Sequence, residues 1–108
     1  MINSLSEKSD QELVSLTLID QNNFGYLIER YEQKLLRYIR RLSNINMETA
    51  EDILQETFIK VYKNLNAYDQ SMKFSSWIYR IAHNEVINFF RKNKNMGTMI
   101  SLDEENGL

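Results

Sequence analysis

The feature that most constrains this chain is an unbroken helical periodicity between Phe24 and Leu42. Apolar side chains recur there every three or four positions, as they do on one face of an α helix. The 108-residue chain has no proline and only three glycines, so few residues interrupt helices. The sequence therefore predicts long amphipathic helices in one domain with a modest core. The apolar face of this first predicted segment consists of Phe24, Leu27, Ile28, Tyr31, Leu35, Tyr38, Ile39 and Leu42.

A shorter helix is expected before this segment. Ser9 and Glu12 have the spacing of a capping box, in which each side chain accepts a hydrogen bond from the other residue's backbone N–H. The polar run 20–23 ends the helix. Its apolar face is predicted to hold Leu13, Leu16 and Ile19.

Two more helices follow the second one. Asn46 is the predicted N-cap of a helix from Met47 to Leu65, and Ser75 is the predicted N-cap of a helix that runs to Lys94. The buried face of the helix that begins at Met47 should hold Ala50, Ile53, Leu54, Thr57, Phe58, Val61, Tyr62 and Leu65. The buried face of the helix that runs to Lys94 should hold Ile78, Ile81, Ala82, Val86, Ile87 and Phe90. The expected fold class is all-α, a compact bundle of four helices.

Residues 1–94 are expected to form this domain, and residues 95–108 a flexible acidic tail. The chain has no cysteine, which excludes disulfides and thiolate metal sites. No apolar run could span a bilayer, and the N-terminus lacks the order of charges and apolar residues found in a signal peptide. We therefore expect a cytoplasmic protein without membrane insertion.

The net charge of −2 hides an uneven distribution. Between Arg30 and Lys94 there are twelve basic and seven acidic residues, while both ends of the chain are acidic. A basic centre permits a nucleic-acid partner that the total charge would not suggest.

Basic residues form a stripe on the second predicted helix. Arg30, Lys34, Arg37 and Arg41 fall at helical spacing, with Arg40 beside them. Taken alone, the stripe is better explained as a solvated face than as a contact surface. The alternative is a contact with phosphates or with an acidic protein.

The start of the third predicted helix carries an acidic and amide face, consisting of Glu51, Asp52, Gln55 and Glu56. Carboxylates are favoured there by the helix dipole alone, and a protein-docking face is the functional alternative. A catalytic or metal role needs a nearby histidine or a second carboxylate cluster, and the only histidine, His83, lies on another helix. We expect no enzyme activity, no metal and no cofactor.

The fourth predicted helix and the loop before it combine aromatic, amide and basic residues. Lys73, Phe74 and Trp77 come first; Arg80, Asn84, Asn88 and Arg91 then recur at helical spacing, followed by Lys92 and Lys94. An aromatic ring stacks on an unstacked base with roughly 1–3 kcal/mol, amides reach base edges, and cations neutralise phosphates. In the alternative reading Phe74 and Trp77 are core residues and Asn84 is a packed amide.

In this order the segments FGYLIERYEQKLLRYIRRL, AEDILQETFIKVYKNLNAYD and KFSSWIYRIAHNEVINFFRKNK resemble region 2 of bacterial sigma factors of the extracytoplasmic-function (ECF) group, over about residues 10–94. The resemblance implies docking on the clamp helices of the RNA polymerase largest subunit through Asp52, Gln55 and Glu56, to which we add Arg37 and Arg41 of the basic stripe. It also implies that the loop and fourth helix recognise the minus-ten promoter element and hold the non-template strand open. The DNA-binding residues expected on this basis are Asn64, Asn66, Tyr68, Asp69, Lys73, Phe74, Trp77, Arg80, Asn84 and Asn88, with Arg91 and Lys92 adding charge.

Two departures from the family pattern stand out. Glu85 and Asn88 occupy positions where the family often has an apolar and an acidic residue, and Glu85 would be unfavourable near DNA unless it points elsewhere. Family members also continue through a linker into a second helical domain that reads the minus-thirty-five element, and SLDEENGL resembles the start of that linker.

The sequence leaves three other functions to consider. One is a regulatory module that binds an anti-sigma factor without productive initiation. A helix-turn-helix repressor of duplex DNA fits less well, because the loop before the fourth helix is long. An enzyme is not supported by any nucleophile–base pair.

Overall fold

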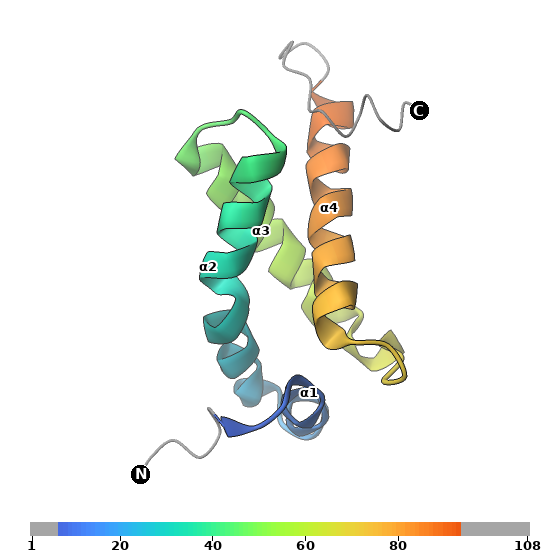
Figure 1. Ribbon diagram of the computed structural model, residues 1–108. Coiled ribbons are helices and arrows are strands. Elements are labelled where there is room, and N and C mark those ends of the chain that lie inside the picture. Colours follow the sequence, from blue (N-terminus) through green and yellow to red (C-terminus); the bar gives the residue numbers. More distant parts are fainter. Residues whose placement is uncertain (1–6, 94–108) are drawn as a thin grey trace.

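The computed structural model describes residues 7–93, which form four α helices (Figure 1). These are α1 (Asp10–Ile19), α2 (Phe24–Leu42), α3 (Met47–Lys63) and α4 (Phe74–Lys92), with two short 3-10 turns, η2 (Gln21–Asn23) and η3 (Leu65–Ala67). Helices α2, α3 and α4 run alternately up and down beside one another, and α1 lies across one end of them. No strand occurs over this range, so the predicted all-α bundle of four helices is confirmed. The predicted tail, 95–108, and Lys94 lie outside the described residues.

Three of the predicted helix starts are confirmed. Ser9 Oγ accepts from the Glu12 N–H at 3.1 Å and Glu12 Oε1 accepts from the Ser9 N–H at 2.8 Å, which completes the capping box. Asn46 Oδ1 caps α3 by accepting from the Thr49 N–H at 2.8 Å. Helix α2 begins at Phe24 and ends at Leu42, as the periodicity predicts.

The predicted N-cap of α4 is wrong. The helix begins at Phe74, and Lys73, at the cap position, makes no side-chain capping bond. The Phe74 ring is 1% exposed and packs edge-on against Tyr31 and Tyr68, with ring centroids 5.7 and 5.3 Å apart. Burial of this ring sets where the chain enters the helix, so Ser75 lies inside the first turn. The helix ends at Lys92.

Helix α3 ends two residues before the predicted end. The Asn64 N–H bonds to the carbonyls of Lys60 and Val61, and its side-chain Nδ2 donates to the Lys60 carbonyl at 2.8 Å. The chain then turns through η3, which still places Leu65 in the core.

The core largely follows the predicted faces, with two errors. Ile19 is 82% exposed and Tyr62 is 41% exposed. Because α1 lies crosswise, it buries Val14 and Thr17 together with the predicted Leu13, and the Thr17 hydroxyl donates to the Leu13 carbonyl. Tyr62 packs its ring edge-on against Phe24 and sends its hydroxyl to Gln21 Oε1.

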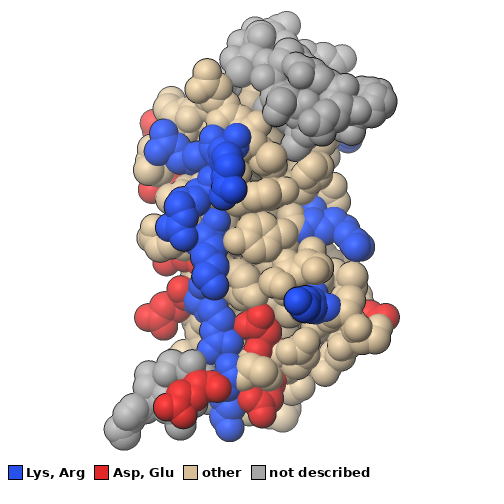
Figure 2. Space-filling view, viewed as in Figure 1, with Lys and Arg blue, Asp and Glu red and all other residues tan. Residues whose placement is uncertain are grey.

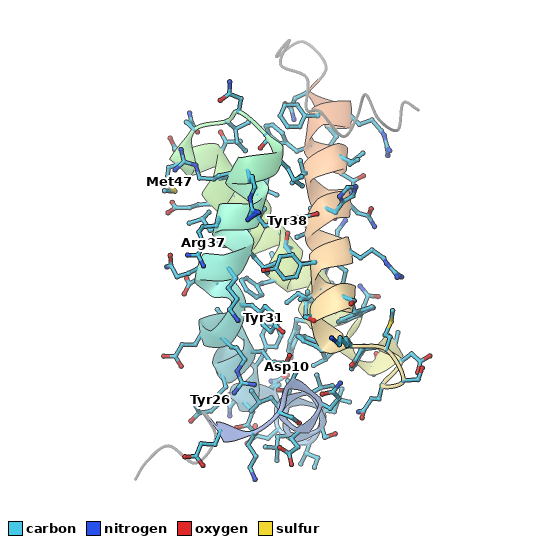
Figure 3. All side chains as sticks on the ribbon, viewed as in Figure 1. Asp10, Tyr26, Tyr31, Arg37, Tyr38 and Met47 are labelled. Carbon is cyan, nitrogen blue, oxygen red and sulfur yellow. The ribbon has the colours of Figure 1, made fainter. Side chains whose placement is uncertain are left out.

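Aromatic rings link the helices in one continuous series. It alternates between α2 and α4, passes through Tyr68 of the loop and ends on α4. In order the rings are Tyr38, Tyr79, Tyr31, Phe74, Tyr68 and Trp77, with successive ring centroids 5.0, 6.4, 5.7, 5.3 and 5.2 Å apart. Tyr31 and Tyr38 point from α2 toward α4 (Figure 3). The first four pairs are edge-to-face, an arrangement that adds to the stabilisation from buried area.

Within residues 7–93, no helix combines the length and the apolar character needed to cross a membrane.

Candidate nucleic-acid and protein interfaces

A cleft of about 430 Å³ lies between the second half of α3 and the face of α4. It brings together three of the predicted DNA-binding side chains from α4, Trp77, Asn84 and Asn88, with Asn64 from the end of α3. The rest of its lining consists of Lys60, Ala67, Ile81 and Glu85. Aromatic, amide and charged groups therefore share one hollow.

Glu85 lies at the boundary of this cleft with the helix interface. It is 7% exposed, and its Oε2 accepts from Lys60 Nζ at 3.0 Å and from Asn88 Nδ2 at 3.2 Å. The hydrogen bond to Glu85, together with the negative charge, raises the pKa of the Lys60 ammonium. Lys60 therefore neutralises the carboxylate, so Glu85 does not present an unpaired charge to solvent.

Two buried aromatic rings pack against Trp77. Its ring stands 5.7 Å from that of Phe74 and 5.2 Å from that of Tyr68, both of which are buried. The Tyr68 hydroxyl donates to the Met72 carbonyl at 2.5 Å and accepts from Gln11 Nε2 at 3.2 Å. Phe74 and Tyr68 therefore occupy the core side of the predicted DNA-binding set, and Trp77, half-buried, is the ring that reaches the cleft.

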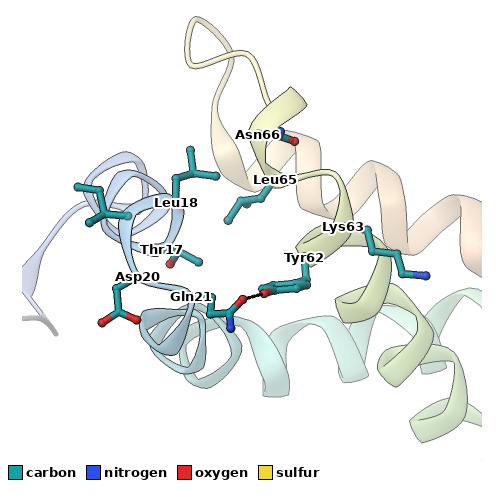
Figure 4. Close-up of a pocket in the computed structure, with 9 residues that line it drawn as sticks. Thr17, Leu18, Asp20, Gln21, Tyr62, Lys63, Leu65 and Asn66 are labelled. Carbon is teal, nitrogen blue, oxygen red and sulfur yellow. Dashed lines mark hydrogen bonds between the residues drawn. The ribbon is translucent and has the colours of Figure 1, made fainter.

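The remaining predicted loop residues lie elsewhere. Asn66 lines a separate hollow of about 520 Å³ between the end of α1 and the end of α3, where Tyr62 bonds to Gln21 (Figure 4). Asp69 is exposed and caps a tight turn, because its Oδ1 accepts from the Ser71 N–H, a bond that lowers the pKa of the carboxyl. Lys73 is exposed before α4. The structure does not bring Asn66 together with Asn84.

The outer face of α4 is basic. Arg80, Arg91 and Lys92 are exposed, and Arg91 Nη1 donates to Asn88 Oδ1 at 3.4 Å. A second basic band runs along α2, where Figure 2 shows the Lys and Arg side chains as a continuous stripe. One of its members, Arg30, donates to Asp10 Oδ1 at 3.0 Å, and Lys34 stands 5.4 Å from the Tyr31 ring centroid.

A groove of about 920 Å³ runs between α2 and α3. Its α3 wall includes Glu51, Asp52 and Gln55. Apolar side chains line the same groove, among them Ile28, Leu36, Phe58 and Ile59. Predicted docking residues therefore border an apolar depression of the kind that receives a partner helix.

Not every predicted docking residue belongs to the groove. Glu56 is exposed on α3 but does not line it. Arg37 and Arg41 are exposed on the basic stripe of α2 and do not line it either. Two surfaces are thus present where one was predicted.

Sequence reasoning missed Lys60 and Ile59, and it noted Glu85 only as a charge that would be unfavourable near DNA. Lys60 and Glu85 lie 25 positions apart and meet only because α3 packs on α4, so no local pattern pairs them. Ile59 is 41% exposed within the acidic face of α3, and an apolar residue at an outward helical position was the available signal. Over the described part of the chain, no group of three His, Cys, Asp or Glu side chains could hold a metal ion. His83 Nδ1 lies 3.3 Å from the Tyr38 hydroxyl.

Comparison with known proteins identifies relatives over most of the chain. The ECF RNA polymerase sigma factor SigW of Bacillus subtilis is 41% identical over 75 residues, which cover 69% of this chain and 40% of SigW. The RNA polymerase sigma-H factor of Pseudomonas aeruginosa is 35% identical over 85 residues, covering 78% of this chain and 44% of that protein. The chain thus spans less than half the length of these relatives.

A solved structure agrees with this relationship. An engineered region 2 of sigmaE, determined by NMR in complex with GTAAAA, superimposes with a TM-score of 0.75 and 32% sequence identity. The likeness covers 89% of this chain and 98% of that one. Residues 27–96, well over half of the chain, match the family described as Sigma-70 region 2. This chain is therefore a member of the Sigma-70 region 2 family, with relatives among the ECF sigma factors.

Proposed function

We propose that this domain recognises promoter DNA for a sigma factor: it docks on the RNA polymerase core and binds the minus-ten element as a separated, non-template single strand. The observation that carries the proposal is the likeness of nearly the whole bundle to a sigmaE region 2 bound to GTAAAA. The proposal implies a cytoplasmic protein, acting where polymerase and chromosome meet.

The cleft between α3 and α4 supports the DNA part of this proposal. Trp77 offers a ring for stacking, the amides of Asn64, Asn84 and Asn88 suit base edges, and Arg80 and Arg91 suit phosphates. Unstacking a base costs a few kcal/mol, which binding in a preformed hollow offsets. Strand separation is then driven by binding and needs no catalytic group.

The groove between α2 and α3 supports the docking part. Clamp helices of the largest polymerase subunit would place an apolar face on Ile28, Leu36 and Ile59, and basic residues opposite Asp52 and Glu51. The basic stripe on α2, with Arg37 and Arg41, remains available for polymerase or for DNA beyond the cleft.

A titration tests the proposal. The 108-residue chain is titrated with labelled oligonucleotides that carry or lack a minus-ten-like motif, as single strands and as duplexes, and separately with a clamp-helix fragment. We expect weak binding that prefers the single strand with the motif and that falls steeply with salt. Arg80→Gln should lower the affinity and reduce the log–log salt slope by about 0.7, because one phosphate contact is lost. Lys8→Gln, which removes an exposed charge near α1, is the matched control.

A preference for duplex over single strand, without clamp binding, would rule out the proposal. Clamp binding without any oligonucleotide binding would favour a regulatory module that engages proteins such as an anti-sigma factor.

A further inference from the structure

Glu85 places a carboxylate in the α3–α4 cleft, beside the groups proposed to bind DNA. Both of its hydrogen-bond donors, Lys60 Nζ and Asn88 Nδ2, bond to the same oxygen, Oε2. The other oxygen, Oε1, has no hydrogen-bond partner among residues 7–93, and Glu85 lines the cleft. A strong acceptor, more than nine-tenths buried, is therefore held in a fixed place beside the cleft.

The surroundings make this acceptor accessible to a base but not repulsive to DNA. Lys60 cancels the charge of Glu85, so a nearby phosphate meets a neutral pair. Trp77 lines the same cleft, and the rings of Phe74 and Tyr68 pack against it. A base stacked on the Trp77 ring would therefore extend the edge of the base into the cleft. A group that approaches Oε1 must be a hydrogen-bond donor, because an acceptor there would meet a lone pair.

Adenine and cytosine carry an exocyclic amino group, a hydrogen-bond donor, at the ring position where guanine and thymine carry a carbonyl oxygen. We propose that this cleft takes one amino-bearing base of the single strand, adenine or cytosine, and that Glu85 selects it against thymine by accepting a hydrogen bond from the exocyclic amine. The inference rests on the proposed DNA-binding function and deepens it, because it names the base chemistry read at one position.

The structure also predicts how a near-isosteric change would alter this selectivity. In Glu85→Gln the amide oxygen should take the position of Oε2, because Lys60 and Asn88 both donate hydrogen bonds there. The amide NH₂ must then take the place of Oε1. A donor replaces an acceptor at the same point, so the variant should lose its preference for an amine and gain one for a carbonyl.

The test uses the 108-residue chain and the hexamer GTAAAA as probe. Each adenine in turn is replaced by purine, which lacks only the amino group, or by thymine, and dissociation constants are measured. In the wild-type chain one position should show an affinity loss of about tenfold for both replacements. In Glu85→Gln the purine penalty at that position should vanish and thymine should bind better than adenine. Glu29→Gln removes the same charge from an exposed site on α2 and should behave as wild type.

The possible results are distinct. If GTAAAA and related single strands do not bind at all, the proposed function itself is wrong. If they bind but no position senses the missing amine, or if the penalty persists in Glu85→Gln, the inference is overturned and Glu85 is only a tie between α3 and α4. Should Glu85→Gln unfold, Glu85→Met fills a similar volume without an acceptor and must likewise abolish the purine penalty.

Discussion

At the scale of single residues, Asp10 connects α1 to α2 through two hydrogen bonds. Its Oδ1 accepts from Arg30 Nη1 at 3.0 Å and its Oδ2 accepts from the Tyr31 hydroxyl at 2.6 Å. The Tyr31 side chain is 4% exposed. Burial, reinforced by the bond to Asp10, raises the pKa of the Tyr31 phenol well above its ordinary value of 10.0. The phenol therefore keeps its proton in the folded state at pH values where an unfolded tyrosine loses it.

This shift predicts a loss of stability in alkali. Because the unfolded state releases a proton that folded Tyr31 retains, the free energy of unfolding should fall as the pH rises through about 10. Tyr31→Phe should cost about 1 kcal/mol at neutral pH, from the lost hydrogen bond, and should make the alkaline decline shallower. Urea unfolding at neutral and alkaline pH measures both effects, with Tyr26→Phe, at an exposed site on α2, as control. Identical alkaline slopes in Tyr31→Phe and wild type would contradict the assignment.

At the scale of helices, local capping signals and long-range packing contribute differently. Helix α3 begins with a side-chain cap from Asn46, whereas α4 begins without one and depends on the burial of Phe74. The two starts should therefore respond to different substitutions.

Removal of the α3 cap tests the first of these. Asn46→Ala leaves the Thr49 N–H without its side-chain acceptor and should lower the free energy of unfolding by about 1 kcal/mol. Asn44→Ala, two residues earlier and exposed outside any helix, should have little effect. Thermal or urea unfolding of the two variants provides the comparison, and equal losses would show that the cap does not stabilise the helix.

The sequence predicted correctly the features that depend on local signals and failed where long-range packing decides. The bounds of α2 and the caps at Ser9 and Asn46 were predictable because each depends on residues within four positions. The start of α4 was not, because the ring contacts of Phe74 with Tyr31 and Tyr68 join distant segments and override the nearby serine.

The candidate site divides in a similar way. Helical spacing alone places Trp77, Asn84 and Asn88 on one flank of α4, and the structure brings them to one cleft. Spacing also places Glu85 on the face of α4 that holds Ile78 and Ala82, but it cannot show that Lys60, on another helix, neutralises its charge. Nor can it separate Asn66 from the cleft, since η3 turns that side chain toward α1.

At the scale of the whole molecule, the proposed protein and DNA surfaces occupy different flanks of α3. The groove toward α2 includes Asp52 and Gln55, and the cleft toward α4 includes Lys60 and Asn64. Among residues 7–93, none lines both hollows. The two binding reactions should therefore be separable by mutation.

Two exposed substitutions check this independence. Asp52→Asn should weaken binding of the clamp-helix fragment by about 1 kcal/mol, as expected for one exposed charge pair, and leave oligonucleotide affinity unchanged. Asn84→Ala should do the reverse. Each variant is the control for the other in parallel titrations, and a change in both affinities from either substitution would show that the surfaces are coupled.

Because the aromatic series ends at Trp77, the intrinsic fluorescence of this residue should report on the state of the molecule. Trp77 is the only tryptophan in the chain. It stands beside Tyr68 and Phe74 at one end of the series, and it also lines the cleft. Light absorbed by the neighbouring tyrosines can pass to it while the bundle is folded, and a base stacked on its face would quench its emission. One intrinsic fluorescence signal therefore distinguishes unfolding, which separates the rings, from occupancy of the cleft, which leaves them together.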